Sequence, residues 1–219
     1  MIKKLLILII AISINAISAE FTKIDSLEHK LSTLENSIER IDILNDLSRE
    51  LLKESTDEAM RLSNEALQLS ERLNYISGKA DANKNLGYAH YYFQQYEQAL
   101  DHYFTSLKLL ENMDAPKDIA DVLGNIGIVY YQTEEYEEAT SYISRSLDIN
   151  RTLNNKAGMA NAYNNLGNIF FVQNDLERAI QFYNESLQIH KETNNTASMI
   201  ATLSNMGISY IILVIIIKL

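Results

Sequence analysis

Apolar residues recur at helical spacing along most of this chain of 219 residues. Two stripes in its middle have members three, four or seven positions apart, which is the pattern of an amphipathic helix. The first stripe comprises Leu100, Tyr103, Phe104, Leu107 and Leu110, and the second comprises Ile119, Val122, Leu123, Ile126 and Tyr130. The chain contains a single proline, so little interrupts such helices. The pattern predicts an all-α fold.

The stripes belong to a repeat of 40 residues, marked by a glycine that follows Asn-x. The glycines are Gly87, Gly127, Gly167 and Gly207, and matching positions hold Ala99, Ala139 and Ala179, then Leu107, Leu147 and Leu187. An older copy keeps Asn45, Ala59 and Leu67 in the same register, although Leu47 replaces the glycine. A fixed period of this length predicts a solenoid. We expect the glycines and alanines where two helices approach closely.

A second recurring set marks the end of each repeat. Its members are Asn74, Asp114, Asn154 and Asn194. Asn and Asp tolerate the left-handed backbone conformation that commonly ends a helix. We therefore expect these residues at the end of the second helix of each repeat.

The repeat resembles the tetratricopeptide repeat. Asn85-Leu86-Gly87-x-x-His90 followed by Ala99-x-x-x-Tyr103 is similar to that family's Leu-Gly-x-x-Tyr and Ala-x-x-x-Phe spacing. The match recurs as Gly127-x-x-Tyr130 with Ala139, and as Gly167-x-x-Phe170 with Ala179-x-x-x-Tyr183. The usual Trp and Pro are absent, and the period is 40 rather than 34, as in the long-repeat variety found in kinesin light chains. The resemblance implies a right-handed superhelical solenoid of antiparallel helix pairs that binds proteins.

The register divides the chain into seven segments. We expect a signal peptide at 1–19, an N-terminal capping helix or half repeat at 20–36, and a divergent repeat at 37–76. Full repeats follow at 77–116, 117–156 and 157–196, and an incomplete repeat with an apolar tail occupies 197–219.

The first 19 residues have the layout of a secretory signal peptide. Lys3 and Lys4 precede an apolar run from 5 to 14, and Ala16, Ser18 and Ala19 offer small residues for cleavage. The alternative is an uncleaved N-terminal anchor, for which the run is short. This pattern predicts an exported protein, periplasmic or secreted.

The last residues depart from the repeat. After Tyr210 a second helix should begin, but the sequence from 211 to 217 is continuously apolar. Three explanations remain open: a truncated or frame-shifted chain, the first part of a membrane anchor, or a tail buried against a partner. The run from 208 to 217 alone is too short for an ordinary membrane span.

Composition and motifs argue against nucleic-acid binding, metal binding and catalysis by this chain. The net charge of −10 argues against nucleic acid as a partner. The absence of Cys excludes disulfides and thiolate metal sites, and the four histidines show no metal spacing. The acidic run from 134 to 138 is interpreted as a solvated helix start rather than a calcium site. We therefore expect no enzyme activity, cofactor or metal.

One polar pattern indicates a binding site. Asn85, Asn125, Asn165 and Asn205 recur on the first helix of each repeat, on the edge that faces the concave groove in the resembled family. Asn both donates and accepts, so such a ladder can hold the backbone of an extended peptide. It resembles the asparagine ladder of the O-linked N-acetylglucosamine transferase repeats. The alternative is that each Asn bonds a neighbouring helix and only fixes the repeat junction.

Other residues are expected on the same face of these helices. They are Asp81, Lys84, Tyr88 and Tyr92, then Asp121 and Ile128, then Asn161, Asn164 and Asn168. The expected function is that of an exported scaffold that binds a peptide or protein segment in its groove. The alternative is the extracytoplasmic sensor of a membrane signalling receptor of the histidine kinase or DNA-binding regulator type. Membrane contact through the C-terminal tail would accompany that alternative.

Overall fold

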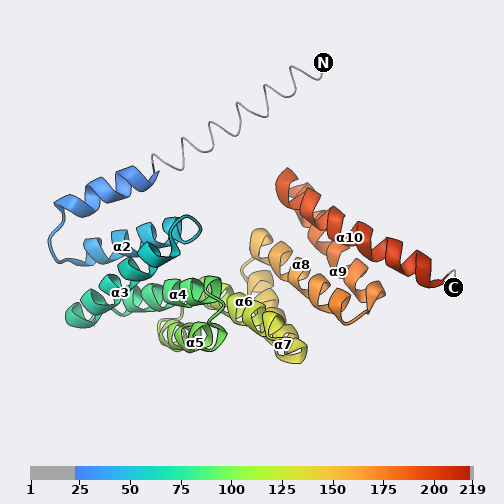
Figure 1. The fold of residues 1–219 in the computed structure, drawn as a ribbon, viewed down its shortest axis with the longest axis horizontal. Helices are drawn as coiled ribbons and strands as arrows, with labels where there is room; N and C mark the ends of the chain where they lie inside the picture. Colours follow the sequence, from blue (N-terminus) through green and yellow to red (C-terminus); the bar gives the residue numbers. More distant parts are fainter. Residues whose placement is uncertain (1–22, 218–219) are drawn as a thin grey trace, which may run out of the picture. The chain divides into compact units, whose positions relative to one another are not determined.

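The structure is a computed structural model that describes residues 23–217 of the chain. The expected signal peptide at 1–19 lies outside the described residues. Within them every regular element is an α-helix, in the order shown in Figure 1. Residues 23–33 are helical, followed by α2 (Ile38–Leu51), α3 (Thr56–Leu73), α4 (Ile76–Tyr92), α5 (Tyr96–Asn112), α6 (Pro116–Gln132), α7 (Tyr136–Thr152), α8 (Lys156–Val172), α9 (Leu176–Glu192) and α10 (Thr196–Ile217). The expected all-α fold class is confirmed.

The turns between helices follow a period of 20 residues, half that of the sequence repeat. A residue with positive φ stands at Asn74, Gln94, Asp114, Glu134, Asn154, Asn174 and Asn194. Each turn closes in the same way, as where the Tyr75 amide donates to the Ser70 carbonyl and the Asn74 amide donates to the Glu71 carbonyl. The left-handed ends predicted at the repeat junctions are confirmed. The turns within the repeats, at Gln94, Glu134 and Asn174, have the same left-handed geometry, which the sequence analysis did not predict.

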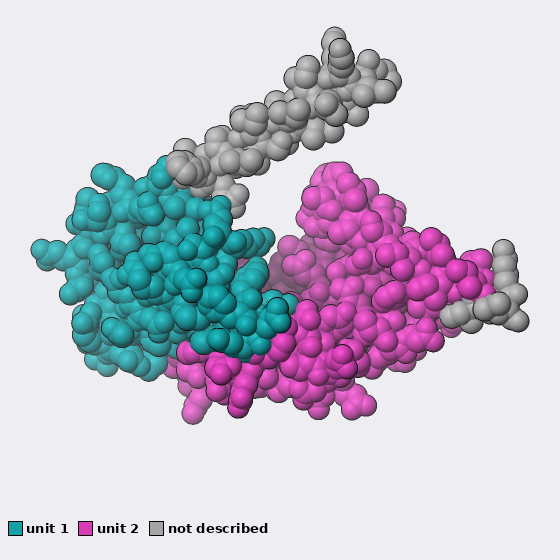
Figure 2. Space-filling model, viewed as in Figure 1, with its two compact units in different colours: residues 1–95 teal, residues 96–219 magenta. Residues whose placement is uncertain are grey.

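The chain divides into two units, residues 1–95 and residues 96–219, which are coloured separately in Figure 2. In unit 1 the core is formed by the helix at 23–33 with α2, α3 and α4, and its buried members are Ile24, Leu27, Ile41, Leu44, Leu47, Leu62, Ala66, Leu69 and Ala82. The Arg40 guanidinium donates to the Leu31 and Leu34 carbonyls and pairs with Glu65 at 2.6 Å. These bonds hold the end of the first helix against α2.

Unit 2 is built from neighbouring helix pairs. α6 packs on α7, α8 packs on α9, and α10 packs on α9 and α8. A Cβ added at Gly127 would lie 2.5 Å from Cγ1 of Ile143, and one at Gly167 would lie 2.5 Å from Cε1 of Tyr183. Both distances are shorter than any real contact, so these glycines are required by close helix packing, as predicted.

The prediction of close packing is wrong at Gly207, where no described atom outside the adjacent backbone of its own helix lies within 4 Å of an added Cβ. The departure from the repeat that the sequence shows after Tyr210 takes the form of a longer helix, because α10 continues without a turn to Ile217. The segment Thr196–Ile215 has a mean hydropathy of 1.8, so by length and composition α10 could cross a membrane. The sequence estimate considered only the run from 208 to 217 and missed the uncharged helix that precedes it.

Candidate functional site

Two neighbouring pockets in unit 2 lie along the first helices of successive repeats, α6, α8 and α10. The first has a volume of about 210 Å³ and is lined by Ile128, Tyr131, Gln132, Ile143, Asn165 and Asn168. The second has a volume of about 300 Å³ and is lined by Tyr131, Asn168, Phe171, Val172, Tyr183, Asn205 and Ile208. Because Tyr131 and Asn168 line both, the pockets form one continuous surface. We call it the amide face.

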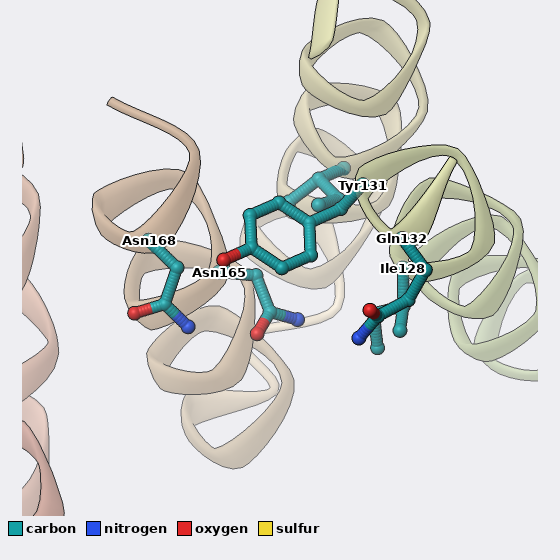
Figure 3. Close-up of a pocket in the computed structure, with 6 residues that line it drawn as sticks. Ile128, Tyr131, Gln132, Asn165 and Asn168 are labelled. Carbon is teal, nitrogen blue, oxygen red and sulfur yellow. The ribbon is translucent and has the colours of Figure 1, made fainter. Parts of the chain in front are cut away.

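The residues of the amide face come together because of helical spacing. On α8, Asn165, Asn168 and Val172 follow one another at intervals of three and four, which places them on the same side of the helix. Ile128 and Tyr131 have the same relation on α6. Figure 3 shows the Tyr131 ring between these two helices, with Asn165 and Asn168 on one side of it and Ile128 and Gln132 on the other.

The asparagine amides of this face have unequal hydrogen bonding. Oδ1 of Asn168 accepts from the Tyr183 hydroxyl at 2.8 Å and from Nδ2 of Asn205 at 3.3 Å. Among the described residues this leaves the Nδ2 donor of Asn168, the Oδ1 acceptor of Asn205 and both groups of Asn165 open. Burial raises the pKa of Tyr183 far above its usual range, so its hydroxyl remains a donor to Asn168.

Apolar side chains surround these amides. Val172 is 42% exposed and Ile208 is 50% exposed, although both are large apolar residues. Ile128 and Phe171 are half-buried beside them. Among residues 23–215 no charged side chain lines either pocket of the amide face. The arrangement can therefore bind a chain through its amide groups while burying apolar side chains.

The predicted site residues of unit 1 have a different environment. Asn85 is only 2% exposed, and its Nδ2 donates to the Asn45 carbonyl at 2.9 Å. Lys84 is 8% exposed and pairs with Asp81 at 2.9 Å. Nδ2 of Asn85 thus bonds a neighbouring helix, as in the structural alternative, while its buried Oδ1 has no partner among the described residues. Tyr88 packs against the cluster formed by Leu52, Ala59 and Ala89, and Tyr92 is 44% exposed.

In unit 2 the predicted residues divide between the amide face and other positions. Four of them line the pockets: Ile128, Asn165, Asn168 and Asn205. Asp121 and Asn161 are exposed, and Asn125 and Asn164 are half-buried, but none of the four lines either pocket.

Sequence reasoning missed Tyr131, Gln132, Phe171 and Val172 on the amide face. Each lies three or four positions after a residue that was named, Ile128 or Asn168, so continuing the helical stripe by one turn would have found them. The predicted asparagines lie near the middle of α6 and α8, whereas the four missed residues lie at the C-terminal ends of these two helices. In the described part of the chain no group of His, Asp or Glu side chains is placed to hold a metal.

Comparison with known proteins agrees with this architecture. Residues 118–192 match the family model of the tetratricopeptide repeat. No curated protein matches the sequence.

Solved structures resemble the chain at low sequence identity. BtubC (BKLC) from P. vanneervenii is 20% identical, with a TM-score of 0.71 over 89% of this chain and 81% of that one. A Rap protein complexed with Competence and Sporulation Factor is 17% identical, with a TM-score of 0.78 over 90% of this chain and 59% of that one.

A STAND signal-transduction ATPase with a tetratricopeptide repeat sensor, from Pyrococcus horikoshii, is also 17% identical, with a TM-score of 0.73. That match covers 84% of this chain and 29% of the ATPase, so the chain spans less than a third of its length. At these identities the likeness concerns the fold. The family match is therefore to residues 118–192, and the described helices share the helical-solenoid fold of the similar structures.

Proposed function

We propose that the chain is a protein-interaction module that binds an extended peptide or protein segment on the amide face of unit 2. The observation that carries this proposal is the open hydrogen-bonding capacity of Asn165, Asn168 and Asn205 beside exposed apolar side chains. An extended backbone presents alternating donors and acceptors, which side-chain amides can satisfy. The ligand is bound and released unchanged, with no chemical step.

The chemistry of the amide face also indicates the kind of segment. Since no charge lines the pockets, charged ligand side chains gain nothing there and lose hydration. Apolar ligand side chains would instead cover Val172 and Ile208, which face solvent in the free protein. We therefore propose an uncharged, extended segment with apolar side chains. The Rap protein among the similar structures is complexed with a factor, which supports a binding role for this fold.

Export is proposed from the sequence pattern of residues 1–19. It predicts a mature chain that begins after Ala19 and is found outside the cytoplasm. N-terminal sequencing of the secreted or periplasmic product checks this directly, and a product that retains Met1 would contradict it.

The receptor alternative depends on α10 as a membrane span. In the fold, however, α10 buries Thr202 and Ser209 against its neighbours, and Asn205 bonds Asn168. Moving the helix into lipid would break this packing and place several polar side chains in hydrocarbon. We therefore propose the binding module rather than the receptor.

The test uses peptides selected from a random phage-displayed library on the full chain. Asn165→Ala should weaken the selected peptides by roughly 2- to 13-fold, because one lost hydrogen bond is worth about 0.5 to 1.5 kcal/mol. Asn165 makes no bond within the described residues, so stability should not change. Asn184→Ala, the same substitution at an exposed position of α9 that lines neither pocket, is the matched control.

A second variant tests the apolar part of the face. Val172→Glu places a charge where the ligand side chain would pack, and it should reduce peptide binding more than Asn165→Ala does. Peptides that bind both variants as well as the natural chain would show that the ligand lies elsewhere. Failure to enrich any peptide above background would also contradict the proposal.

A further inference from the structure

The hydrogen bonds of Asn168 use its carbonyl oxygen and leave its amino group open. Oδ1 accepts from the Tyr183 hydroxyl at 2.8 Å and from Nδ2 of Asn205 at 3.3 Å. A carbonyl oxygen has two lone pairs, so these two bonds fill its capacity to accept. Nδ2 makes no hydrogen bond among the described residues, and in Figure 3 it lies on the side of Asn165 while Oδ1 points the other way. Asn168 can therefore only donate to a ligand.

Asn205 has the complementary role. Its Nδ2 donates to Asn168, and its Oδ1 accepts no bond from the described residues. We call Asn168 and Asn205 the amide pair. The pair is polar, because its Asn168 end presents an amino group and the one acceptor that it leaves open is Oδ1 of Asn205. Asn165 makes no bond within the described residues, so its amide can turn to present either group to a ligand.

The same two amides could bond in the opposite direction. If both side-chain amides turned over, Nδ2 of Asn168 would donate to Oδ1 of Asn205, and the groups that they present to a ligand would be exchanged. The oxygen and the amino group of an amide have nearly the same size, so packing alone does not distinguish the two directions. A third group must therefore select one of them.

Tyr183 supplies that group. Its side chain is buried, and an added Cβ at Gly167 would lie 2.5 Å from its Cε1, so the ring is held closely against α8. Its hydroxyl makes no other hydrogen bond among the described residues. In the reversed pair an amino group would replace Oδ1 of Asn168, and the hydroxyl hydrogen would lose its acceptor in apolar surroundings that include Phe170 and Phe182. Tyr183 therefore favours the direction that is observed.

We propose that Tyr183 is a positioning residue that fixes the polarity of the amide pair, and that the bound segment places a backbone carbonyl at Asn168 and a backbone N–H at Asn205. An extended chain presents both groups along one edge. A segment that places a carbonyl at Oδ1 of Asn205 is disfavoured, because two acceptors then face each other. This inference rests on the proposed function, since it concerns the ligand of the same face.

Backbone-altered peptides test the polarity. The probe is a peptide selected by phage display on the full chain, together with copies in which one amide at a time is replaced by an ester, which removes a single N–H. We expect one ester position to weaken binding by roughly 2- to 13-fold, because Oδ1 of Asn205 loses its donor. The loss at that position should disappear in Asn205→Ala, which has no acceptor to lose.

Tyr183→Phe tests the positioning role. The ring stays and only the hydroxyl is lost, so the amide pair can take both directions, and the loss caused by the same ester should fall to less than about twofold. Tyr163→Phe is the matched control, because Tyr163 is a buried tyrosine whose hydroxyl accepts from Arg151 and which lines neither pocket. It should keep the full ester effect. A purely structural role of Tyr183 would change the affinities of the amide and ester peptides equally.

Two acid variants test whether Asn168 only donates. Asn168→Asp keeps an oxygen for Tyr183 and Asn205 but replaces the amino group by a second oxygen, which would face the ligand carbonyl. It should weaken the selected peptide by at least about tenfold. Asn165→Asp adds the same charge one turn away on α8, but its carboxylate can turn an oxygen toward a ligand N–H, so it should weaken the peptide by less than about threefold. Circular dichroism checks that each variant is folded.

The outcomes separate this inference from the proposed function. If peptides are enriched and Val172→Glu reduces their binding, but no ester effect depends on Asn205 or Tyr183, the inference is wrong and the proposed function stands. Equal losses in Asn168→Asp and Asn165→Asp would also overturn the inference alone. If no peptide is enriched, the proposed function fails and the inference fails with it.

Discussion

Helices α4 in unit 1 and α8 in unit 2 are the same part of the repeat, 80 residues apart, yet their central asparagines differ in environment. Asn85 is buried and donates to a backbone carbonyl of α2, whereas Asn165 is half-buried, lines a pocket and makes no bond within the described residues. The same position of the repeat therefore bonds two helices together in unit 1 and lines a pocket in unit 2.

The neighbouring side chains explain this difference. In unit 1, α2 and α4 lie close together: Ala82 joins the core formed with Ile41, and a Cβ on Gly78 would lie 2.5 Å from Cγ2 of Ile41. The position of Ala89 in α4 holds Ile169 in α8, and both are fully buried. Gly78 and Ala82 have the same residue type 80 positions later, at Gly158 and Ala162, so among these positions only Ala89, which is Ile169 in α8, distinguishes the two helices. The smaller side chain accompanies the closed helix contact of unit 1, and the larger one accompanies the pocket of unit 2.

The sharpest test replaces each asparagine by its isosteric acid. Asn85→Asp puts a buried carboxylate against the Asn45 carbonyl and should destabilise the chain by about 3 kcal/mol or more. Asn165→Asp places the same group at a pocket that reaches solvent and should change stability by no more than about 0.5 kcal/mol. Urea unfolding of both variants measures the difference. Equal losses would show that the two amides share one environment.

The next test extends the comparison to α10 through the repeat glycine. Gly167→Ala drives a methyl group into the Tyr183 ring and should cost about 1 to 3 kcal/mol. Gly207→Ala meets no described atom, so the better helix propensity of Ala should raise stability by about 0.5 to 1 kcal/mol. The two melting temperatures should therefore move in opposite directions. Losses of the same size would mean that both glycines are packed.

The sequence predicted the fold and its register better than it predicted the candidate site. Periodicity depends on each helix having a buried side, so the stripes, the close-packed Gly127 and Gly167 and the left-handed Asn154 followed from spacing alone. Whether each asparagine is buried or faces a pocket depends on residues of other helices, which are far away in sequence, as Asn45 is from Asn85. Asn85 and Asn165 share a motif, and only their neighbours distinguish them.

A change of pH should have a smaller effect on the stability of the fold. As the pH falls, one group in unit 2 should lower the stability and one group in unit 1 should raise it. Burial lowers the pKa of His190 in unit 2, so the fold favours the neutral ring and stability falls as the pH decreases below about 6.5. Burial raises the pKa of Asp42 in unit 1, followed by repulsion from Asp81. The fold there favours the protonated acid, so stability is gained as the pH falls through that raised pKa.

Two variants separate these contributions. His190→Gln should show a smaller loss of stability between pH 7 and about 5.5 than the natural chain, and Asp42→Asn should lose the gain at lower pH. His29→Gln, at an exposed position, is the matched control and should keep the natural profile. Thermal unfolding across this range measures all three. An unchanged slope in His190→Gln would show that the ring does not titrate with folding.

The smallest effect concerns the turns, where one backbone conformation is adopted by Asn in some turns and by other residues in others. Asn74 in unit 1 has φ of 52°, and Glu134 in unit 2 has φ of 65°. Asn adopts this region at less cost than most residues, whereas Glu has no such advantage. Glu134→Asn should therefore raise stability by about 0.5 kcal/mol, and Asn74→Glu should lower it by a similar amount. Urea midpoints measure both, with Glu137→Asn as the control for removing an acidic charge at an exposed helical position. A gain in Glu137→Asn equal to that in Glu134→Asn would assign the effect to charge rather than to the backbone.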